Sequence, residues 1–412
     1  MSEKTKTFCY VMIITTFFVI ALESVNTLVF SHYLKNKEIP FKQKDLIYTL
    51  AAENPNTFFR AEKKGVEHQL YKLSAKIMSF TLSFVCCYVI LSKRTQKKFR
   101  KNLNRIYTPV RQNFRDLTSE EINLVTGVFT YVFLADLLTD VLYKGVSKWG
   151  LIIKAAFIVM GYLYLIPIVL FLSNLLFSQF GAKLIMAAYF SWLMITIIQF
   201  STLEPVDTNK MVKMEIGVFN ETIREQLHKY RLHDSVYIER KPSKETNAAL
   251  VGYGPRRRIE IYGGLSEDSE ENLFSVILHE IGHAEDHSLV KKMATYILLI
   301  VLEMIIVMFI YLSAAPKFAT QNISRFSCFA LLFLVYRLFL QSYIFMVFKL
   351  VSQTCEINAD KFAQKFNYGP ILGETLYNIV IDGKEYIKPT SLYTMFTSTH
   401  PPIGNRINSL RE

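Results

Sequence analysis

The feature that most constrains the fold is the recurrence of long apolar stretches. A helix of roughly 20 apolar residues crosses about 30 Å of hydrocarbon. The sequence contains seven stretches of about this length, near residues 8–30, 73–91, 121–142, 151–172, 184–200, 290–313 and 326–350. The first is longer than the apolar core of a signal peptide and contains Glu23, so we expect it to be retained. The pattern predicts an α-helical polytopic membrane protein with about seven transmembrane helices.

The composition agrees with a membrane protein and argues against a soluble one. Hydrophobic residues make up 51% of the chain and charged residues 20%, and the mean hydropathy is +0.22. The net charge of +12 is best explained by basic loops flanking membrane spans, and no nucleic-acid partner is expected. The first two loops are almost equally rich in Lys and Arg, so charge alone does not orient the chain.

Ionisable residues within the apolar stretches indicate a polar interior. Such groups are costly against lipid and usually face other helices or a hydrated cavity. They are Glu23, Asp136, Asp140, Lys154, Glu303 and Arg337. The alternative is that they form pairwise salt bridges that only hold helices together.

Two polar segments are predicted to form one domain. Residues 201–289 follow the first five spans, which lie within residues 1–200, and residues 351–412 follow the last two, which lie within 290–350. Because two spans separate the polar segments, both emerge on the same face of the membrane. Alternating residues at 234–240 and 258–262 predict a small antiparallel sheet, which leads into an amphipathic helix over 270–287.

That helix carries an HExxH motif, His279-Glu280-Ile281-Gly282-His283. Residues four apart share one helical face, so the two imidazoles can reach one metal ion while Glu280 approaches the bound water. The alternative is a polar helix face with two unrelated histidines. His287 is not expected to be the third ligand, because it lies about 12 Å along the axis from His279.

The better candidate for a third ligand lies after the seventh apolar stretch, in Cys355-Glu356-Ile357-Asn358-Ala359-Asp360. Glu356 and Asp360 are again four apart, so one carboxylate can bind zinc while the other orients a ligand imidazole. Two histidines and a glutamate with an open fourth position form a thermolysin-type catalytic site. We therefore predict one Zn²⁺ per chain. The alternative is a solvated helix with ordinary charges.

These motifs together resemble a known family. HEIGH, an apolar helical hairpin, EINAD and the segment Ser398-Thr-His-Pro-Pro-Ile-Gly-Asn-Arg406 are similar to the membrane zinc metalloproteases that include the type I CAAX prenyl proteases. Residues 246–252 resemble the family's edge-strand block. The HtpX-type quality-control proteases share these motifs but have about four spans, so seven spans favour the CAAX branch. The chain departs from that branch in having Ala284 where tryptophan usually follows HExxH.

The resemblance implies a role for each matching residue. His279, His283 and Glu356 are the implied zinc ligands, and Glu280 is the implied general base. Asp360 is implied to support a ligand from behind. Further implied roles are contact with the scissile carbonyl for His400 and Arg406, and substrate binding by strand addition for Asn247 and Ala248. A turn histidine, a surface arginine and a plain structural strand are the respective alternatives.

The implied function is removal of the last three residues of prenylated CAAX proteins. The implied architecture is a gluzincin-like zinc metalloprotease domain with a small β-sheet, and transmembrane helices that enclose a chamber. We expect a monomer in the endoplasmic reticulum membrane, with the protease domain on the cytosolic side and the bilayer and the prenylated protein as partners. A broad quality-control protease of HtpX type and a non-enzymatic scaffold or channel are the alternatives.

Overall fold

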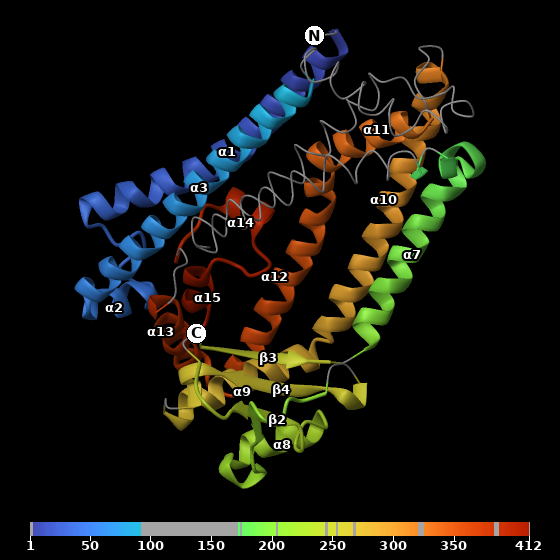
Figure 1. The fold of residues 1–412 in the computed structure, drawn as a ribbon. Coiled ribbons are helices and arrows are strands. Elements are labelled where there is room, and N and C mark those ends of the chain that lie inside the picture. Colours follow the sequence, from blue (N-terminus) through green and yellow to red (C-terminus); the bar gives the residue numbers. More distant parts are fainter. Residues whose placement is uncertain are drawn as a thin grey trace. The chain divides into compact units, whose positions relative to one another are not determined.

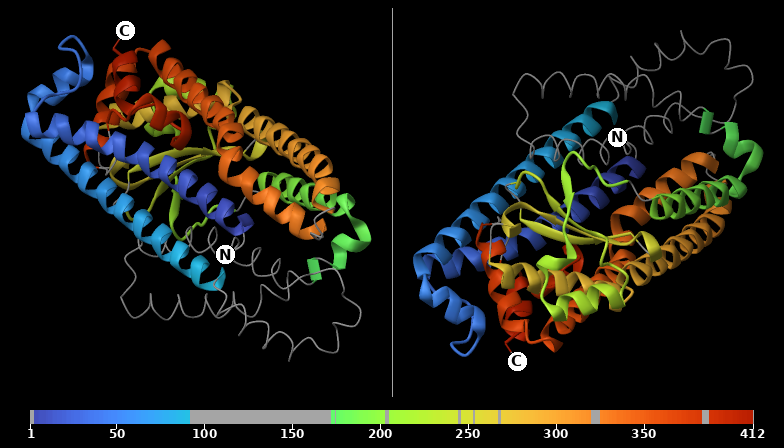
Figure 2. Two further views of the ribbon diagram at one scale, coloured as in Figure 1. Left: turned by 90° about the horizontal axis from the view of Figure 1, so that it is seen from above. Right: turned by 90° about the horizontal axis from the view of Figure 1, so that it is seen from below.

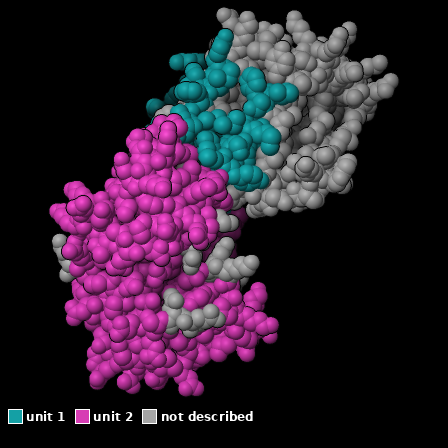
Figure 3. Space-filling view, turned by 90° about the vertical axis from the view of Figure 1, so that its left-hand side faces the viewer, with its two compact units in different colours: residues 1–24, 69–192, 300–343 teal, residues 25–68, 193–299, 344–412 magenta. Residues whose placement is uncertain are grey.

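The computed structural model describes residues 3–91, 172–173, 175–202, 205–243, 246–252, 254–266, 269–319, 325–382 and 387–411. The chain divides into two compact units, shown in different colours in Figure 3. Unit 1 comprises residues 1–24, 69–192 and 300–343, and unit 2 comprises residues 25–68, 193–299 and 344–412. All of the candidate site residues belong to unit 2.

Long helices occupy the predicted apolar stretches that fall in the described residues (Figure 1). They are α1 (Glu3–Asn36), α3 (Pro55–Leu91), α7 (Ala182–Ser201), α10 (Ser288–Ala319), α11 (Arg325–Phe339) and α12 (Gln341–Lys365). Among the described helices, two are long and apolar enough to cross a membrane, at Ala182–Ser201 and Ser288–Lys317. They match the fifth and sixth predicted spans. The predicted span 121–142 and all but the last residue of the predicted span 151–172 lie outside the described residues.

The seventh predicted span is not one continuous helix. A turn at Leu340 separates α11 from α12, and α12 continues past residue 350 to Lys365. The prediction of a single helix over 326–350 is therefore wrong in this detail. Neither Gly nor Pro marks the break, so hydropathy and turn-residue signals pass over it.

Two ionisable groups of the apolar stretches have partners within unit 1. Glu23 Oε1 lies 2.6 Å from Lys76 Nζ, which is the pairwise arrangement considered above. Glu303 is fully buried, and its Oε1 accepts hydrogen bonds from Tyr189 Oη at 3.2 Å and Gln341 Nε2 at 3.3 Å. A buried carboxyl with neutral polar partners fits the polar interior instead. Asp136, Asp140 and Lys154 lie outside the described residues.

Unit 2 contains a four-stranded sheet in the order β1-β2-β4-β3 (Figures 1 and 2). The strands are β1 (Met211–Lys213), β2 (Val236–Glu239), β3 (Asn247–Val251) and β4 (Arg258–Tyr262). β1 is antiparallel to β2 and β3 to β4, whereas β2 and β4 are parallel. The prediction of an antiparallel sheet is therefore wrong for its central pair. β3 comes between β2 and β4 in the sequence, but in the sheet it lies on the outer side of β4 and runs antiparallel to it. β3 is therefore an edge strand, and β2 and β4 are neighbours.

The core of unit 2 lies between this sheet and helices α8 (Glu221–Lys229) and α9 (Glu270–Glu285). Alternate residues Ile259 and Ile261 of β4 are fully buried in the same cluster as Ile277 and Ile281 of α9. Burying each such side chain contributes about 1.5–3 kcal/mol. Short 3-10 turns at Ile216–Val218, Gly254–Arg256 and Gly263–Ser266 connect the elements. The HExxH helix is thus anchored along its apolar face.

A second apolar cluster joins segments far apart in sequence. It includes Ile47 of α2 (Leu46–Glu53), Phe58 of α3, Val380 of α13 (Gly369–Asp382) and Ile407 of α15 (Ile403–Ser409). The remaining short helix, α14 (Ser391–Thr397), precedes the segment with His400. The cluster therefore fixes α15, and with it Arg406, against the N-terminal part of unit 2.

Glu62 of α3 is buried beside this second cluster, and its Oε1 accepts a bond of 3.4 Å from the Ile387 N–H. Burial raises its pKa from 4.5 to about 7, opposed only by that bond. Between about pH 4.5 and pH 7, Glu62 loses its proton in the unfolded chain and keeps it in the folded chain. The free energy of unfolding therefore falls as pH rises, by about 3 kcal/mol in all.

We therefore expect the drop in Tm between pH 5 and pH 8 to be smaller in Glu62→Gln than in the wild type. Thermal unfolding of the full chain in detergent measures the difference. Glu67→Gln, which changes a side chain 64% exposed on the same helix, is the control and should behave as the wild type does. An unchanged pH dependence in Glu62→Gln would contradict the prediction.

Candidate zinc site

Helix α9 presents the three residues of the HExxH motif at one place. Its N-terminus is capped by Ser269, whose Oγ accepts the Asn272 N–H, and Glu270 and Glu271 lie in its first turn. One ligand atom each from His279, Glu280 and His283 lie within 4.8 Å of one another. The predicted convergence of these side chains is therefore present, and all three are largely buried.

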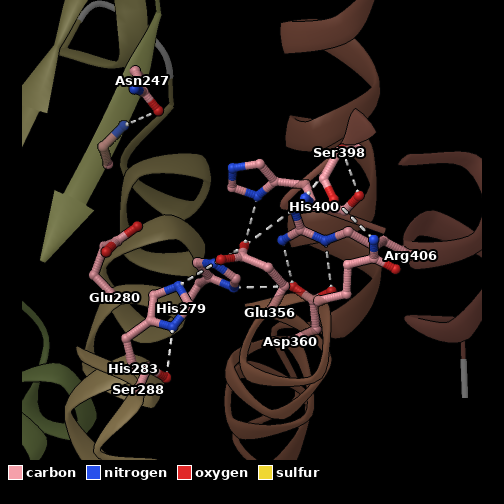
Figure 4. A network of polar contacts seen from close by, with 12 residues as sticks. Asn247, His279, Glu280, His283, Ser288, Glu356, Asp360, Ser398, His400 and Arg406 are labelled. Carbon is pink, nitrogen blue, oxygen red and sulfur yellow. Dashed lines mark hydrogen bonds and ion pairs between the residues drawn. The ribbon is translucent and has the colours of Figure 1, made fainter. Parts of the chain in front are cut away.

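Helix α12 brings Glu356 against the two imidazoles (Figure 4). Its carboxylate oxygens lie 3.6 Å from His279 Nε2 and 3.5 Å from His283 Nε2. Two ligands of a tetrahedral zinc ion are about 3.4 Å apart when each bond is about 2.1 Å. Two nitrogens and a carboxylate at this spacing are a donor set that fits zinc.

A close approach of two helices makes this geometry possible. A Cβ at Gly282 would lie 2.8 Å from Ala359 Cα and 2.9 Å from its carbonyl oxygen, so any side chain there would collide with the α12 backbone. Gly282 lies between the two histidines, and Ala359 lies between Glu356 and Asp360. Small residues at both positions therefore let the two motifs face each other.

His279 is supported from behind by a buried ion pair. Its Nδ1 lies 2.9 Å from Asp360 Oδ1, which directs Nε2 toward Glu356. Asp360 in turn accepts two hydrogen bonds of 2.8 Å from Nε and Nη2 of Arg406, which is 6% exposed. The same guanidinium also contacts Glu356, with Nη1 lying 3.6 Å from Glu356 Oε2. Because its side chain is buried, Arg406 is not the surface arginine considered as the alternative.

The electrostatics of the site keep Glu356 ionised and His283 neutral. Burial opposes charge on Glu356, but hydrogen bonds and charges from His279, His400 and His283 outweigh it, and the pKa of Glu356 is lowered. Burial and the charge of His279 lower the pKa of His283 to about 3, so its imidazole is neutral. A neutral imidazole beside an ionised carboxylate is the form in which both bind a metal.

Glu280 is tied to the edge strand β3. Its Oε2 accepts a bond of 2.6 Å from the Leu250 N–H of β3. Burial raises the pKa of Glu280, which moves it toward the pH at which a general base works best. No sequence pattern predicts the contact with Leu250, since it depends on how β3 passes over α9.

The predicted substrate-binding residues lie on β3, which is an edge strand of the sheet formed by the described residues. Alternate residues of an antiparallel strand direct their N–H groups to opposite sides. The N–H groups of Ala248 and Leu250 point away from β4. The Ala248 N–H donates to Asn247 Oδ1 at 2.9 Å, and the Leu250 N–H donates to Glu280. Asn247 and Ala248 thus lie on an edge strand, as predicted. The outward N–H groups of this strand are bonded to side chains.

His400 lies at the exposed side of the site. Its Nδ1 is 3.2 Å from Glu356 Oε2, and its side chain is 62% exposed. Ser398 forms a tight turn with it, since Oγ accepts the His400 N–H at 3.1 Å and donates to its carbonyl at 2.8 Å. Gln353 of α12 donates to the carbonyls of Thr394 and Ser398, which holds this segment in place.

Three further polar residues at the site are absent from the predicted set. Lys292 Nζ lies 3.5 Å from Glu356 Oε1. Ser288 lies beside His283, and Asp286 lies beside Ser288. His287, considered above as a ligand, instead occupies the turn between α9 and α10 with φ of 51°. In the sequence, only the polar run Asp286-His287-Ser288 after the motif marks this turn. This run does not match a known motif spacing, so it does not indicate a role for these residues.

Comparison with known proteins agrees with the geometry. Residues 218–412 match the model of Peptidase family M48. This range contains every candidate residue named above. The chain is therefore similar to peptidase family M48 over residues 218–412.

Two curated relatives are named as a CAAX prenyl protease 1 homolog and a probable CAAX prenyl protease 1. The chain is 24% identical over 183 residues to the CAAX prenyl protease 1 homolog of Oryza sativa subsp. japonica, covering 41% of each. It is 27% identical over 173 residues to the probable CAAX prenyl protease 1 of Schizosaccharomyces pombe, covering 41% of this chain and 36% of that one. The matched regions thus span about two fifths of these relatives. The predicted resemblance to the CAAX branch is confirmed.

The fold is similar to a crystal structure of S. mikatae Ste24p. The TM-score is 0.62 at 18% identity, and the match covers 98% of this chain and 99% of that chain. The likeness therefore extends over the helices outside the family match as well as over the peptidase region.

Proposed function

We propose that this chain is an integral membrane zinc metalloendopeptidase that removes the C-terminal tripeptide of prenylated CAAX proteins. The observation that carries the proposal is the convergence of His279, His283 and Glu356, with Glu280 beside them. The names of the curated relatives support the substrate class. The helices at Ala182–Ser201 and Ser288–Lys317 support the membrane setting.

The roles of the residues follow from their positions. His279, His283 and Glu356 would hold one zinc ion, which would polarise the scissile carbonyl and lower the pKa of a water. Glu280 takes the proton of the attacking water and passes it to the leaving amine. His400, on the open side, donates to the developing oxyanion. Arg406 acts through Asp360 and Glu356, which it holds in place.

The substrate peptide is proposed to pair with the β3 edge at Asn247 and Ala248. Extended peptides add to sheet edges through main-chain hydrogen bonds. The side chain of Asn247 then gives up the Ala248 N–H to the incoming strand. Since Leu250 on the same edge bonds Glu280, a peptide bound there is presented directly to the general base.

The architecture around the peptidase region also belongs to the proposal. We propose seven transmembrane helices that enclose a chamber, with the peptidase domain formed by residues 201–289 and 351–412. An apolar wall suits the prenyl group, and the polar interior around residues such as Glu303 suits the peptide. The proposed setting is a monomer in the endoplasmic reticulum membrane with the peptidase domain facing the cytosol.

The test compares a farnesylated CAAX peptide with the same peptide unmodified, using the purified full chain in detergent. We expect release of the tripeptide, loss of release after zinc chelation, and recovery on adding zinc. The farnesylated peptide should have a kcat/KM at least about tenfold higher, because an apolar group of this size is recognised by burial.

Two outcomes would count against the proposal. Equal cleavage of both peptides would indicate a quality-control protease of HtpX type. A protein that binds no zinc and cleaves neither peptide would indicate a scaffold or channel.

A further inference from the structure

The second histidine of the motif has a support that the mechanism above does not use. His283 Nδ1 lies 3.1 Å from Ser288 Oγ, and Ser288 is 3% exposed. The Ser288 hydroxyl donates to Asp286 Oδ2 at 2.9 Å. The three residues form a chain from the imidazole to a carboxylate. Figure 4 shows Ser288 on the side of His283 away from Glu356.

The direction of these bonds decides the tautomer of His283. A serine hydroxyl has one proton, and here it is directed at the carboxylate of Asp286. Its oxygen is therefore an acceptor toward His283, so Nδ1 carries the proton of the neutral ring. Nε2 then presents its lone pair toward His279 and Glu356, as a metal ligand must.

Asp286 is itself held from two further helices. Its Oδ1 accepts a hydrogen bond of 2.8 Å from Asn358 Nδ2 of α12 and is paired with Lys291 of α10. The side chain is 9% exposed. A carboxylate with this many donors keeps its charge and its orientation, and these donors lower its pKa despite burial.

The backbone brings these groups together at the junction of α9 and α10. His287 adopts φ of 51°, a left-handed conformation uncommon outside glycine. This reversal places Ser288, the first residue of α10, back against His283 five residues earlier. Asn358 lies on the same turn of α12 as Glu356, so one helix turn carries both a donor to Asp286 and the third candidate ligand.

We propose that Ser288 and Asp286 are positioning residues that hold His283 in its metal-binding orientation and tautomer, and that they thereby set the zinc affinity of the site. His279 is supported by a carboxylate backed by Arg406, and His283 by a hydroxyl backed by Asp286. The proposal rests on the proposed function only in taking zinc as the metal.

The experiment measures zinc affinity of the purified full chain by competition with a chromogenic chelator, without any substrate. Ser288→Ala and Asp286→Asn are each expected to weaken zinc binding about 10–100-fold, the usual effect of removing a partner behind a metal ligand. Ser288→Thr keeps the hydroxyl and should recover most of the affinity.

A matched control separates this role from general destabilisation. Ser275→Ala removes a fully buried hydroxyl of α9, whose Oγ donates to the Asn272 carbonyl and lies far along the helix from His283. It should leave zinc affinity within about twofold of the wild type, and Tm measured without zinc reports any loss of folding in each variant.

The outcomes are distinguishable from failure of the proposed function. If the wild type binds zinc and Ser288→Ala, Asp286→Asn and Ser275→Ala all bind it equally well, this inference is overturned while the peptidase proposal stands. If the wild type binds no zinc, both are overturned. Weak binding in Ser288→Ala with recovery in Ser288→Thr supports the positioning role even if no CAAX peptide is cleaved.

Discussion

Replacing Glu280 by glutamine is expected to lower kcat for peptide cleavage by about 10²–10⁴-fold, the range that general acid–base catalysis supplies. Glutamine has nearly the same shape and can still accept the Leu250 N–H through its carbonyl oxygen, so β3 and α9 should keep their contact. It has no site for the proton of the attacking water. The rate should therefore fall while the protein stays folded.

Zinc content decides how this result is interpreted. His279, His283 and Glu356 are unchanged in Glu280→Gln, so the variant should bind zinc as the wild type does. Glu271→Gln changes an exposed carboxylate in the first turn of the same helix and should keep nearly full activity. Unchanged tripeptide release by Glu280→Gln would remove Glu280 from its proposed role. A loss of zinc together with activity would assign it to the metal site instead.

Replacing Arg406 by methionine should cost about 3–5 kcal/mol of stability, because it leaves the carboxylate of Asp360 buried without its cation. Both guanidinium bonds to Asp360 measure 2.8 Å, and both side chains are almost fully buried. For a domain of this size the loss corresponds to a fall in Tm of roughly 6–20 °C. Thermal unfolding of the zinc-loaded full chain measures it.

A double variant tests whether the effect comes from the stranded carboxylate. Replacing Asp360 by leucine together with Arg406→Met removes both charges and should be less destabilising than Arg406→Met alone. Arg411→Met, which changes an exposed arginine five residues further on, should have little effect. Equal losses in the two arginine variants would contradict the buried ion pair.

Zinc affinity should also fall in Arg406→Met, because Asp360 then holds His279 less firmly. The conservative variant Arg406→Lys tests whether Arg406 also contacts the scissile carbonyl. Arg406→Lys keeps one cation near Asp360 but loses the bidentate geometry, so a larger loss in kcat than in zinc affinity or Tm would indicate an additional direct role.

Much of the candidate site could be predicted because its parts are local. The i, i+4 spacing of His279 and His283, and again of Glu356 and Asp360, places each pair on one helix face regardless of context. The acidic first turn and Ser269 also mark the start of α9 in sequence. Edge placement of β3 rested on resemblance to known proteins, and its outward N–H groups agree with it.

The errors arose where long-range pairing or a break without a marker decided the structure. Val236–Glu239 and Arg258–Tyr262 both alternate as strands do, and alternation says nothing about whether two strands run parallel. The break at Leu340 lies within a predicted span that contains neither Gly nor Pro. The contact of Glu280 with Leu250 and the support of His283 by Ser288 join main-chain and side-chain atoms whose placement follows from turns that have no fixed sequence spacing.

By itself, the sequence determined that the chain carries long apolar helices and two helical motifs with metal-binding chemistry. Helix periodicity and hydrophobic burial are local enough for the order of residues to specify them. Only the tertiary structure decided how the two motifs meet, since this depends on the close packing of Gly282 against Ala359. It also decided that Arg406 is buried on Asp360, because the position of α15 is set by an apolar cluster built from both ends of the chain.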